Sequence, residues 1–303
     1  MKKEKQLIRF DWAIKKLLRN KANFDILEGF LSELLSENIT IQQILDSESN
    51  KEHENDKHNR VDILVEDAKG DLVIIEVQNS KEYDYFHRIL YGTSKAITEH
   101  ITEGDAYAKV KKVISVTIAY FDLGQGKDYV YHGKNEFRGI HHGDVLNLAD
   151  QQKKVYQQKE VSKIFPEYWL IKVSQFNDAV QNKLDEWIYF LKNGAIEEGF
   201  TAKGLMEAKE KLDKINLSKE ERIAYKAFVK RLMDIASEQH TKMIDAEFLI
   251  EKSIKKGMEK GIEQTQIKAI IGFDAIGVRA ADIANALNLS IKEVQEVLTK
   301  HKK

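Results

Sequence analysis

RVDILVED at residues 60–67, AKGD at 68–71 and LVIIEVQ at 72–78 are the three consecutive pieces of sequence that decide the fold. The first and third pieces are rich in β-branched and aliphatic residues, which predicts two strands. The piece between them is a turn, in which Gly70 is available for a positive φ angle. LVIIEVQ is apolar over most of its length, which is typical of a central strand covered on both faces. Together the three pieces predict a β-hairpin inside a layered structure.

The elements on both sides of this hairpin predict an α/β domain. Helices are expected at 7–19, 24–35 and 81–102, strands at 39–45, 111–123 and 128–133, and an exposed polar loop at 46–59. This order of helices and strands implies a mixed β-sheet core flanked by helices. After residue 178 the pattern becomes helical and charged, and 279–298 reads as two short helices joined at Asn288. We therefore expect an α/β domain over 1–240 and an α-helical C-terminal extension over 241–303.

The composition narrows the class of protein. The chain has 303 residues and no cysteine, which excludes disulfide bonds, thiolate metal sites and a cysteine nucleophile, and suits a reducing cytoplasm. No stretch has the apolar length of a membrane span, and the opening MKKEKQLIRFDW lacks the apolar core of a signal peptide. We expect a cytoplasmic protein without membrane contact. The net charge of -1 gives no overall attraction for nucleic acid, so contacts with phosphates require a local patch.

Two carboxylates of the hairpin are the candidate functional groups. Asp62 and Glu76 each stand among apolar residues, where a buried carboxylate needs a partner or a cation. Side chains two apart on a strand point the same way, so Glu76 and Gln78 share a face, and Asp62 can face Glu76 across the hairpin. Two carboxylates, an amide oxygen and a backbone carbonyl would form an all-oxygen site of the kind that Mg²⁺ prefers. Such an ion can activate water and stabilise charge on a scissile phosphate.

The same spacing also fits a site without metal. Asp62 would then pair with Arg60 or a lysine, and Glu76 would lie at a strand end that water reaches. From spacing alone, both interpretations stay open.

Four short motifs, taken in order, resemble a known family. Asp62, a glycine-containing turn and IIEVQ resemble the D-x(n)-E-x-K core of the PD-(D/E)XK nuclease superfamily, with Gln78 in the lysine position. More closely, the chain resembles the Rpn family of recombination-promoting nucleases, also described as putative transposases. The motifs that carry this resemblance are DWAIK at 11–15, VDILVED at 61–67, IIEVQ at 74–78 and YFHRILYGTSK at 85–95. In the last motif Arg88 and Tyr91 resemble the family's arginine followed by a tyrosine, and the resemblance covers roughly residues 8–240.

The resemblance implies a PD-(D/E)XK-like fold and Mg²⁺-dependent cleavage of DNA, with Mn²⁺ as the other candidate ion. It makes Asp62 and Glu76 the metal ligands, with Asp11 as a further acidic ligand from the first helix. Gln78 would take the place of the motif lysine, but a neutral amide orients water without supplying charge. Lys15 is the candidate replacement, because the family pattern has a lysine there.

Each of the additional site residues has a plainer interpretation. In this interpretation Asp11 is a charge favoured at a helix N-terminus, and Lys15 is an exposed residue beside Lys16. Arg88 is then an ordinary surface arginine and not a partner for an active-site acid or a phosphate. For the whole chain, the rival function is a catalytically inactive DNA-binding or oligomerisation protein on a nuclease fold. The retention of Asp62 and Glu76 argues against that rival, and the missing lysine argues for it.

The last segment, 279–298, has two interpretations. Ala284, Asn288 and Val294 fall where helix-turn-helix motifs place an alanine, a turn residue and an apolar residue, which predicts contact with DNA. The alternative is a small helical hairpin that joins copies of the chain into a homo-oligomer.

Overall fold

The computed structural model describes residues 7–16, 18, 20–45 and 62–301, and the loop predicted at 46–59 lies outside these residues. The chain divides into two compact units, Met1–Tyr225 and Lys226–Lys303, which we describe separately. The boundary predicted near residue 240 stays a prediction.

The first unit is built on a mixed six-stranded sheet with the strand order β1-β2-β3-β4-β6-β5. The strands are β1 Ile41–Leu45, β2 Ile63–Asp67, β3 Leu72–Gln78, β4 Val113–Ala119, β5 Val130–Gly133 and β6 Glu167–Lys172. β3 pairs parallel with β4, and β4 pairs parallel with β6. The remaining pairs, β1 with β2, β2 with β3 and β5 with β6, are antiparallel. The predicted α/β class with a mixed sheet is confirmed.

The hairpin of β2 and β3 forms as predicted. Ile63 pairs with Ile75 and Leu64 with Ile74. Asp67 Oδ1 fixes the turn by accepting hydrogen bonds from the backbone N–H groups of Lys69 at 2.8 Å and Asp71 at 2.9 Å. Gly70 has a φ angle of 85°, the conformation that the turn requires of it.

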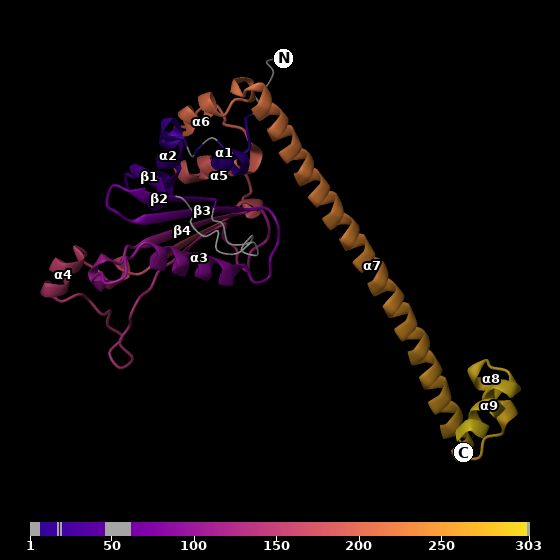
Figure 1. The fold of residues 1–303 in the computed structure, drawn as a ribbon. Helices are drawn as coiled ribbons and strands as arrows, with labels where there is room; N and C mark the ends of the chain where they lie inside the picture. Colours follow the sequence, from indigo (N-terminus) through magenta and orange to yellow (C-terminus); the bar gives the residue numbers. More distant parts are fainter. Residues whose placement is uncertain (1–6, 17, 19, 46–61, 302–303) are drawn as a thin grey trace. The chain divides into compact units, whose positions relative to one another are not determined.

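Helices cover both faces of this sheet (Figure 1). The helices are α1 Phe10–Lys16, α2 Phe24–Leu35, α3 Tyr85–Glu99, α4 Asp150–Tyr156, α5 Lys183–Asn193 and α6 Leu205–Lys211. Short 3-10 helices lie at Lys21–Asn23, Tyr107–Lys109, Val161–Lys163, Val173–Gln175 and Lys214–Asn216. α1, α2, α5 and α6 lie on one face, and α3 lies on the other (Figure 1). β3 is therefore a central strand covered on both sides, which explains its continuous apolar sequence.

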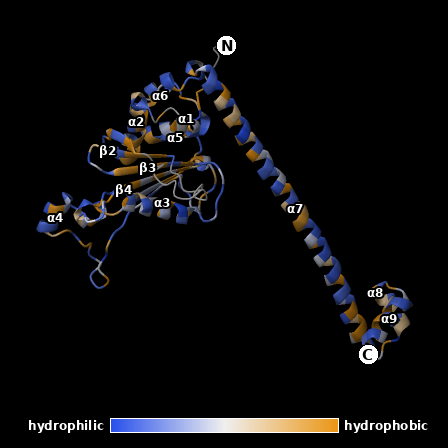
Figure 2. Cartoon of the chain, in the orientation of Figure 1, coloured by the Kyte–Doolittle hydropathy of each residue, from blue (hydrophilic) through white to orange (hydrophobic). Residues whose placement is uncertain are grey.

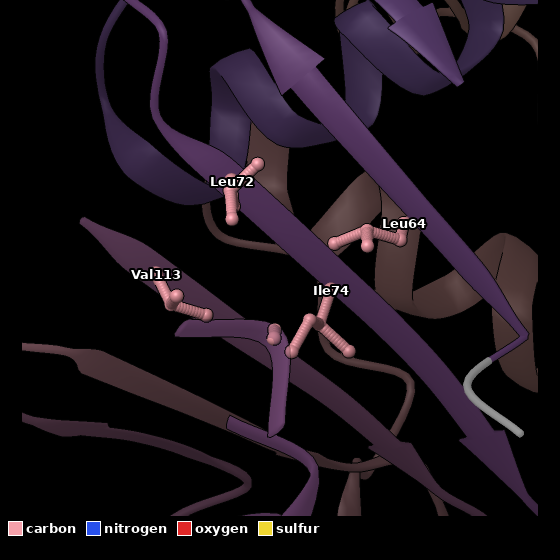
Figure 3. Close-up of a cluster of buried hydrophobic side chains, with 5 residues drawn as sticks. Leu64, Leu72, Ile74 and Val113 are labelled. Atoms are coloured by element: carbon pink, nitrogen blue, oxygen red, sulfur yellow. The ribbon is translucent and has the colours of Figure 1, made fainter. Parts of the chain in front are cut away.

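Each helical layer contributes its own core. On the side of α1, α2 and α5, the rings of Phe10, Phe30 and Trp187 pack edge to face with centroid distances of 5.5 to 6.2 Å. On the side of α3, Figure 3 shows the cluster that joins β2, β3 and β4. The buried members of that cluster are Leu64, Leu72, Ile74, Ala96 and Val113. Figure 2 shows the same concentration of hydrophobic residues along β2, β3 and β4.

Several elements begin or end at other residues than the sequence predicts. The helix expected at 81–102 is α3, Tyr85–Glu99, and the one expected at 7–19 is α1, Phe10–Lys16. The strand expected at 60–67 begins at Ile63, so Asp62 lies in a bend directly before β2. β6 has no counterpart among the predicted elements.

The second unit contains most of one long helix and two short ones. α7 spans Lys219–Ala275, a length of 57 residues, and α8 Ala280–Leu287 and α9 Ile291–His301 follow it. Ile270, Ile283, Ala284 and Val294 form the small buried core of this unit. Asn288 has a left-handed conformation between α8 and α9, with a φ angle of 54°, which confirms the two short helices predicted to join there. No helix in the described part of the chain is long and apolar enough to cross a membrane.

Candidate active site

The hairpin register brings Asp62 and Glu76 together. The pairing of Ile63 with Ile75 places the residue before Ile63 beside the residue after Ile75. The carboxylate of Asp62 lies at this point of β3, because its Oδ2 accepts a hydrogen bond from the backbone N–H of Val77 at 2.7 Å. Of the predicted site residues, Asp62 and Glu76 therefore lie side by side at one end of the hairpin.

Glu76 belongs to the row of β3 side chains that faces α3. Leu72 and Ile74 precede it in this row and are buried in the cluster beneath α3. Thr117 of β4 pairs with Glu76 in the parallel register, so its side chain lies on the same face. The row thus changes from apolar to polar toward the end of β3, where Glu76 is only 8% exposed.

An arginine from α3 neutralises part of the charge of Glu76. Arg88 Nη2 lies 2.6 Å from Glu76 Oε1. Burial raises the pKa of the Glu76 carboxyl, the neighbouring charges of Asp62 and Glu82 raise it further, and Arg88 opposes this rise. A second cation at this position would therefore stabilise the charged form of Glu76.

Arg88 also connects Glu76 to Gln78 through an acid that the sequence analysis missed. Its Nη1 donates to both carboxylate oxygens of Glu82, at 3.0 and 3.1 Å. Gln78 Nε2 donates to Glu82 Oε1 at 2.6 Å and to the carbonyl oxygen of Ser80 at 3.2 Å. Arg88 is therefore paired with two carboxylates and is not an ordinary surface arginine. Its predicted roles, contact with a phosphate or with an active-site acid, stay predictions. The only sequence signal for Glu82 is its position in the short segment between the E-x-Q motif and the helix that carries Arg88.

Two hydroxyl groups are buried against this cluster. Tyr85 Oη and Thr117 Oγ1 are both buried and interact with each other, and neither makes a hydrogen bond of ordinary geometry to another group within the described part of the chain. Burial raises the pKa of the Tyr85 hydroxyl, and the neighbouring charge of Glu76 raises it further.

Asp11 of α1 lies at the same end of β3 as Glu76. It is 1% exposed in the first turn of α1 and accepts hydrogen bonds from Arg9 Nη2 at 3.0 Å and from Asn79 Nδ2 at 3.1 Å. Asn79 directly follows Gln78, so Asp11 is linked to the residue just after the E-x-Q motif. Asp11 Oδ1 also accepts from the backbone N–H of Trp12 at 2.9 Å, a local bond that suits its position at the helix start. Its role as a metal ligand stays a prediction.

Lys15 lies in α1, four residues after Asp11, and its side chain is outside the described part of the structure. Its predicted role as the replacement for the motif lysine therefore stays a prediction.

The chemistry of this donor set fits Mg²⁺. Mg²⁺ is commonly held by one or two carboxylates, with water and substrate phosphate oxygens completing its shell. Asp62 and Glu76 are two such carboxylates, placed side by side by the hairpin register. The residues that the structure describes contain no group of three or more His, Cys, Asp or Glu side chains arranged around one metal position.

A separate cavity of about 680 Å³ lies at the opposite end of β3. It is lined by residues of the β2–β3 turn and of the segment before β4, among them Lys69, Asp71, Lys111 and Lys112. Its lysines are paired with acids, Lys69 with Glu37 and Lys112 with Glu167, so the cavity offers little uncompensated positive charge.

A mixed sheet whose central hairpin carries paired acids and an E-x-Q motif at one end is the architecture of the PD-(D/E)XK nuclease class. The sequence model of one family of this class, described as PD-(D/E)XK nuclease family transposase, matches residues 8–242. The chain belongs to this family, and the resemblance drawn from the four motifs is confirmed. No curated protein and no solved structure matches the chain.

Proposed function

We propose that this protein is a metal-dependent DNA endonuclease that hydrolyses phosphodiester bonds. The observation that carries the proposal is the position of the Asp62 carboxylate, hydrogen-bonded to the Val77 amide directly beside Glu76 in the hairpin of a nuclease family.

In this proposal Asp62 and Glu76 hold Mg²⁺ or Mn²⁺, and Asp11 contributes from α1. The bound ion lowers the pKa of a water molecule and stabilises the negative charge of the phosphate under attack. The Val77 amide orients the Asp62 carboxylate by donating a hydrogen bond to its Oδ2 at 2.7 Å. Gln78 lies on the same face as Glu76, where its amide can orient water or substrate.

DNA is the proposed substrate, as the description of the family as nuclease and transposase suggests. We also propose that the C-terminal helices join copies of this chain into a homo-oligomer. Apolar side chains of α7 that are more than half exposed support this part of the proposal. They include Ile254, Met258 and Ile262.

The rival function is a catalytically inactive DNA-binding or oligomerisation protein on the same fold. The ion pair between Arg88 and Glu76 favours it, because the guanidinium occupies one oxygen of a proposed metal ligand. In a cleaving enzyme, by contrast, Glu76 must exchange or share this bond when the metal enters.

Cleavage of supercoiled plasmid, measured first in EDTA and then after addition of Mg²⁺ or Mn²⁺, separates the two functions. The endonuclease is expected to be silent in EDTA and to nick or linearise the plasmid once metal is restored. Cleavage that continues undiminished in EDTA contradicts the metal-dependent function. DNA binding without cleavage under every metal condition supports the inactive rival.

A further inference from the structure

The E-x-Q motif leaves the candidate site without the positive charge that a motif lysine would bring to the phosphate. The structure offers a cation at the same place from a different element. Arg88 of α3 contacts Glu76 at 2.6 Å, and it shares the carboxylate of Glu82 with Gln78, the residue in the lysine position.

We propose that Arg88 supplies the charge that Gln78 cannot, by binding the scissile phosphate from α3, and that Glu82 is the residue that positions it. This inference rests on the proposed nuclease function and assigns a catalytic residue within it.

The surroundings of Arg88 suit a catalytic cation better than a structural one. Its side chain is 26% exposed, so it is partly shielded from solvent but still within reach of a bound substrate. The ring of Tyr85 lies 5.7 Å below the guanidinium carbon and holds the group in place by a cation–π contact. A guanidinium carries five N–H groups in one plane, so bonds to two carboxylates leave donors for phosphate oxygens.

Glu82 has the contacts expected of a positioning residue. Both oxygens of its carboxylate accept hydrogen bonds from Arg88 Nη1, and Oε1 also accepts one from Gln78 Nε2. If Glu76 releases Arg88 to bind metal, Glu82 still holds the guanidinium next to the end of β3. The charges agree with this role, because the carboxylates of Glu76 and Glu82 both contact the one guanidinium of Arg88. A divalent cation would compensate the negative charge that remains.

The test compares single-turnover cleavage rates of the full-length wild type with those of Arg88→Gln, Arg88→Lys and Gln78→Lys/Arg88→Gln. Loss of one positioned charged donor typically lowers such a rate on the order of 10²-fold to 10³-fold. We expect this loss in Arg88→Gln, and a smaller loss in Arg88→Lys, which keeps the charge but not the planar fork. Gln78→Lys should restore at least about 10-fold in the Arg88→Gln background, because it returns the charge to the strand. Arg138→Gln, which removes an exposed arginine paired with Glu136, is the matched control and should cleave at the wild-type rate.

A second readout separates catalysis from structure. Mg²⁺ affinity, measured by calorimetry, should be unchanged or tighter in Arg88→Gln, because Glu76 no longer has a competing cation. The cleavage rate of Glu82→Ala should fall as in Arg88→Gln. The double variant Glu82→Ala/Arg88→Gln should be no slower than either single variant, because each single variant already loses the same positioned charge. Urea denaturation of each variant shows whether it folds. If Arg88→Gln does not fold, the cleavage rate of Arg88→Lys is compared with that of the wild type instead.

The outcomes are distinguishable. If the wild type cleaves and folded Arg88→Gln cleaves equally fast, this inference is overturned while the nuclease function stands. The inference is also overturned, in favour of Lys15, if Lys15→Ala lowers the cleavage rate about 100-fold while Arg88→Gln leaves it unchanged. A wild type that cleaves with neither Mg²⁺ nor Mn²⁺ overturns the proposed function and this inference together.

Discussion

Replacing Asp62 by asparagine should abolish stabilisation by Mg²⁺ while leaving the metal-free fold intact. The bond from the Val77 amide to Asp62 Oδ2 measures 2.7 Å, and an asparagine oxygen can still accept it. Exchanging a charged acceptor for a neutral one costs on the order of 1 kcal/mol. Removing the charge beside Glu76 relieves a repulsion of similar size, since that repulsion contributes to the raised pKa of Glu76. The free energy of unfolding in EDTA should therefore stay within about 1 kcal/mol of the wild type.

The metal gives the larger effect. At a Mg²⁺ concentration about 100 times its dissociation constant, a ligand that binds only the folded state stabilises it by about 2.7 kcal/mol. Urea denaturation in EDTA and in Mg²⁺ should show this gain for the wild type and little of it for Asp62→Asn. Asp150→Asn, whose side chain is 88% exposed on α4, is the matched control and should keep the full gain. An equal gain in Asp62→Asn refutes the assignment of Asp62 as a ligand, and a loss above about 3 kcal/mol in EDTA shows that its carboxylate is structural.

Four further predictions concern the rest of the chain. A Cβ on Gly29 would overlap the backbone carbonyl oxygen of Lys203, so Gly29→Ala should destabilise the first unit by about 1–3 kcal/mol in urea denaturation. Gly257→Ala, which meets nothing in α7, should instead raise helix stability by about 0.5–1 kcal/mol. Burial, and then the charge of Asp67, raise the pKa of Asp71 from 3.8 to about 6. The folded state therefore holds this proton more tightly than the unfolded state, and stability should fall as pH rises from about 4 through about 6. Asp71→Asn should remove this fall in stability. If the melting temperature of Asp71→Asn depends on pH as in the wild type, the pH dependence does not come from Asp71. Deleting 251–303, which removes Ile254, Met258 and Ile262 of α7, should preserve metal-dependent cleavage and lower the number of copies per particle measured by light scattering. An unchanged number of copies contradicts the proposed oligomer.

The central hairpin could be predicted from sequence because its signals are local. β3 is a continuous apolar run that ends at a turn, and the period of two along a strand places Glu76 and Gln78 on one face. The same hairpin register places Asp62 beside Glu76. These relations need only the sequence and the geometry of a strand.

β6 could not be predicted, because its stability depends on distant partners. Its first residue, Glu167, is buried and pairs with Lys112 at 2.7 Å. Its last residue, Lys172, is also buried, and its Nζ lies 3.2 Å from Asp122. In the sequence these charges resemble solvent-exposed ends, and only the folded sheet brings their partners near.

Arg88 and Glu82 show the same limit at the candidate site. Their sequence positions give no distance to Glu76, because that distance depends on how α3 packs against the sheet. The packing of Tyr85, Ile89 and Ala119 in one buried cluster fixes this arrangement. The acids of the hairpin were therefore accessible to sequence reasoning, and the groups that surround them were not.

The claim that Asp62 and Glu76 hold the metal required for cleavage is tested most directly by the plasmid-cleavage rate of Glu76→Gln in Mg²⁺. Glutamine keeps the shape of the side chain and removes its charge, so the variant should fold, as circular dichroism can verify. We predict that the wild type nicks supercoiled plasmid, that Asp150→Asn does so at the same rate, and that Glu76→Gln is slower on the order of 10²-fold or more. A folded Glu76→Gln that cleaves as fast as the wild type would contradict the claim.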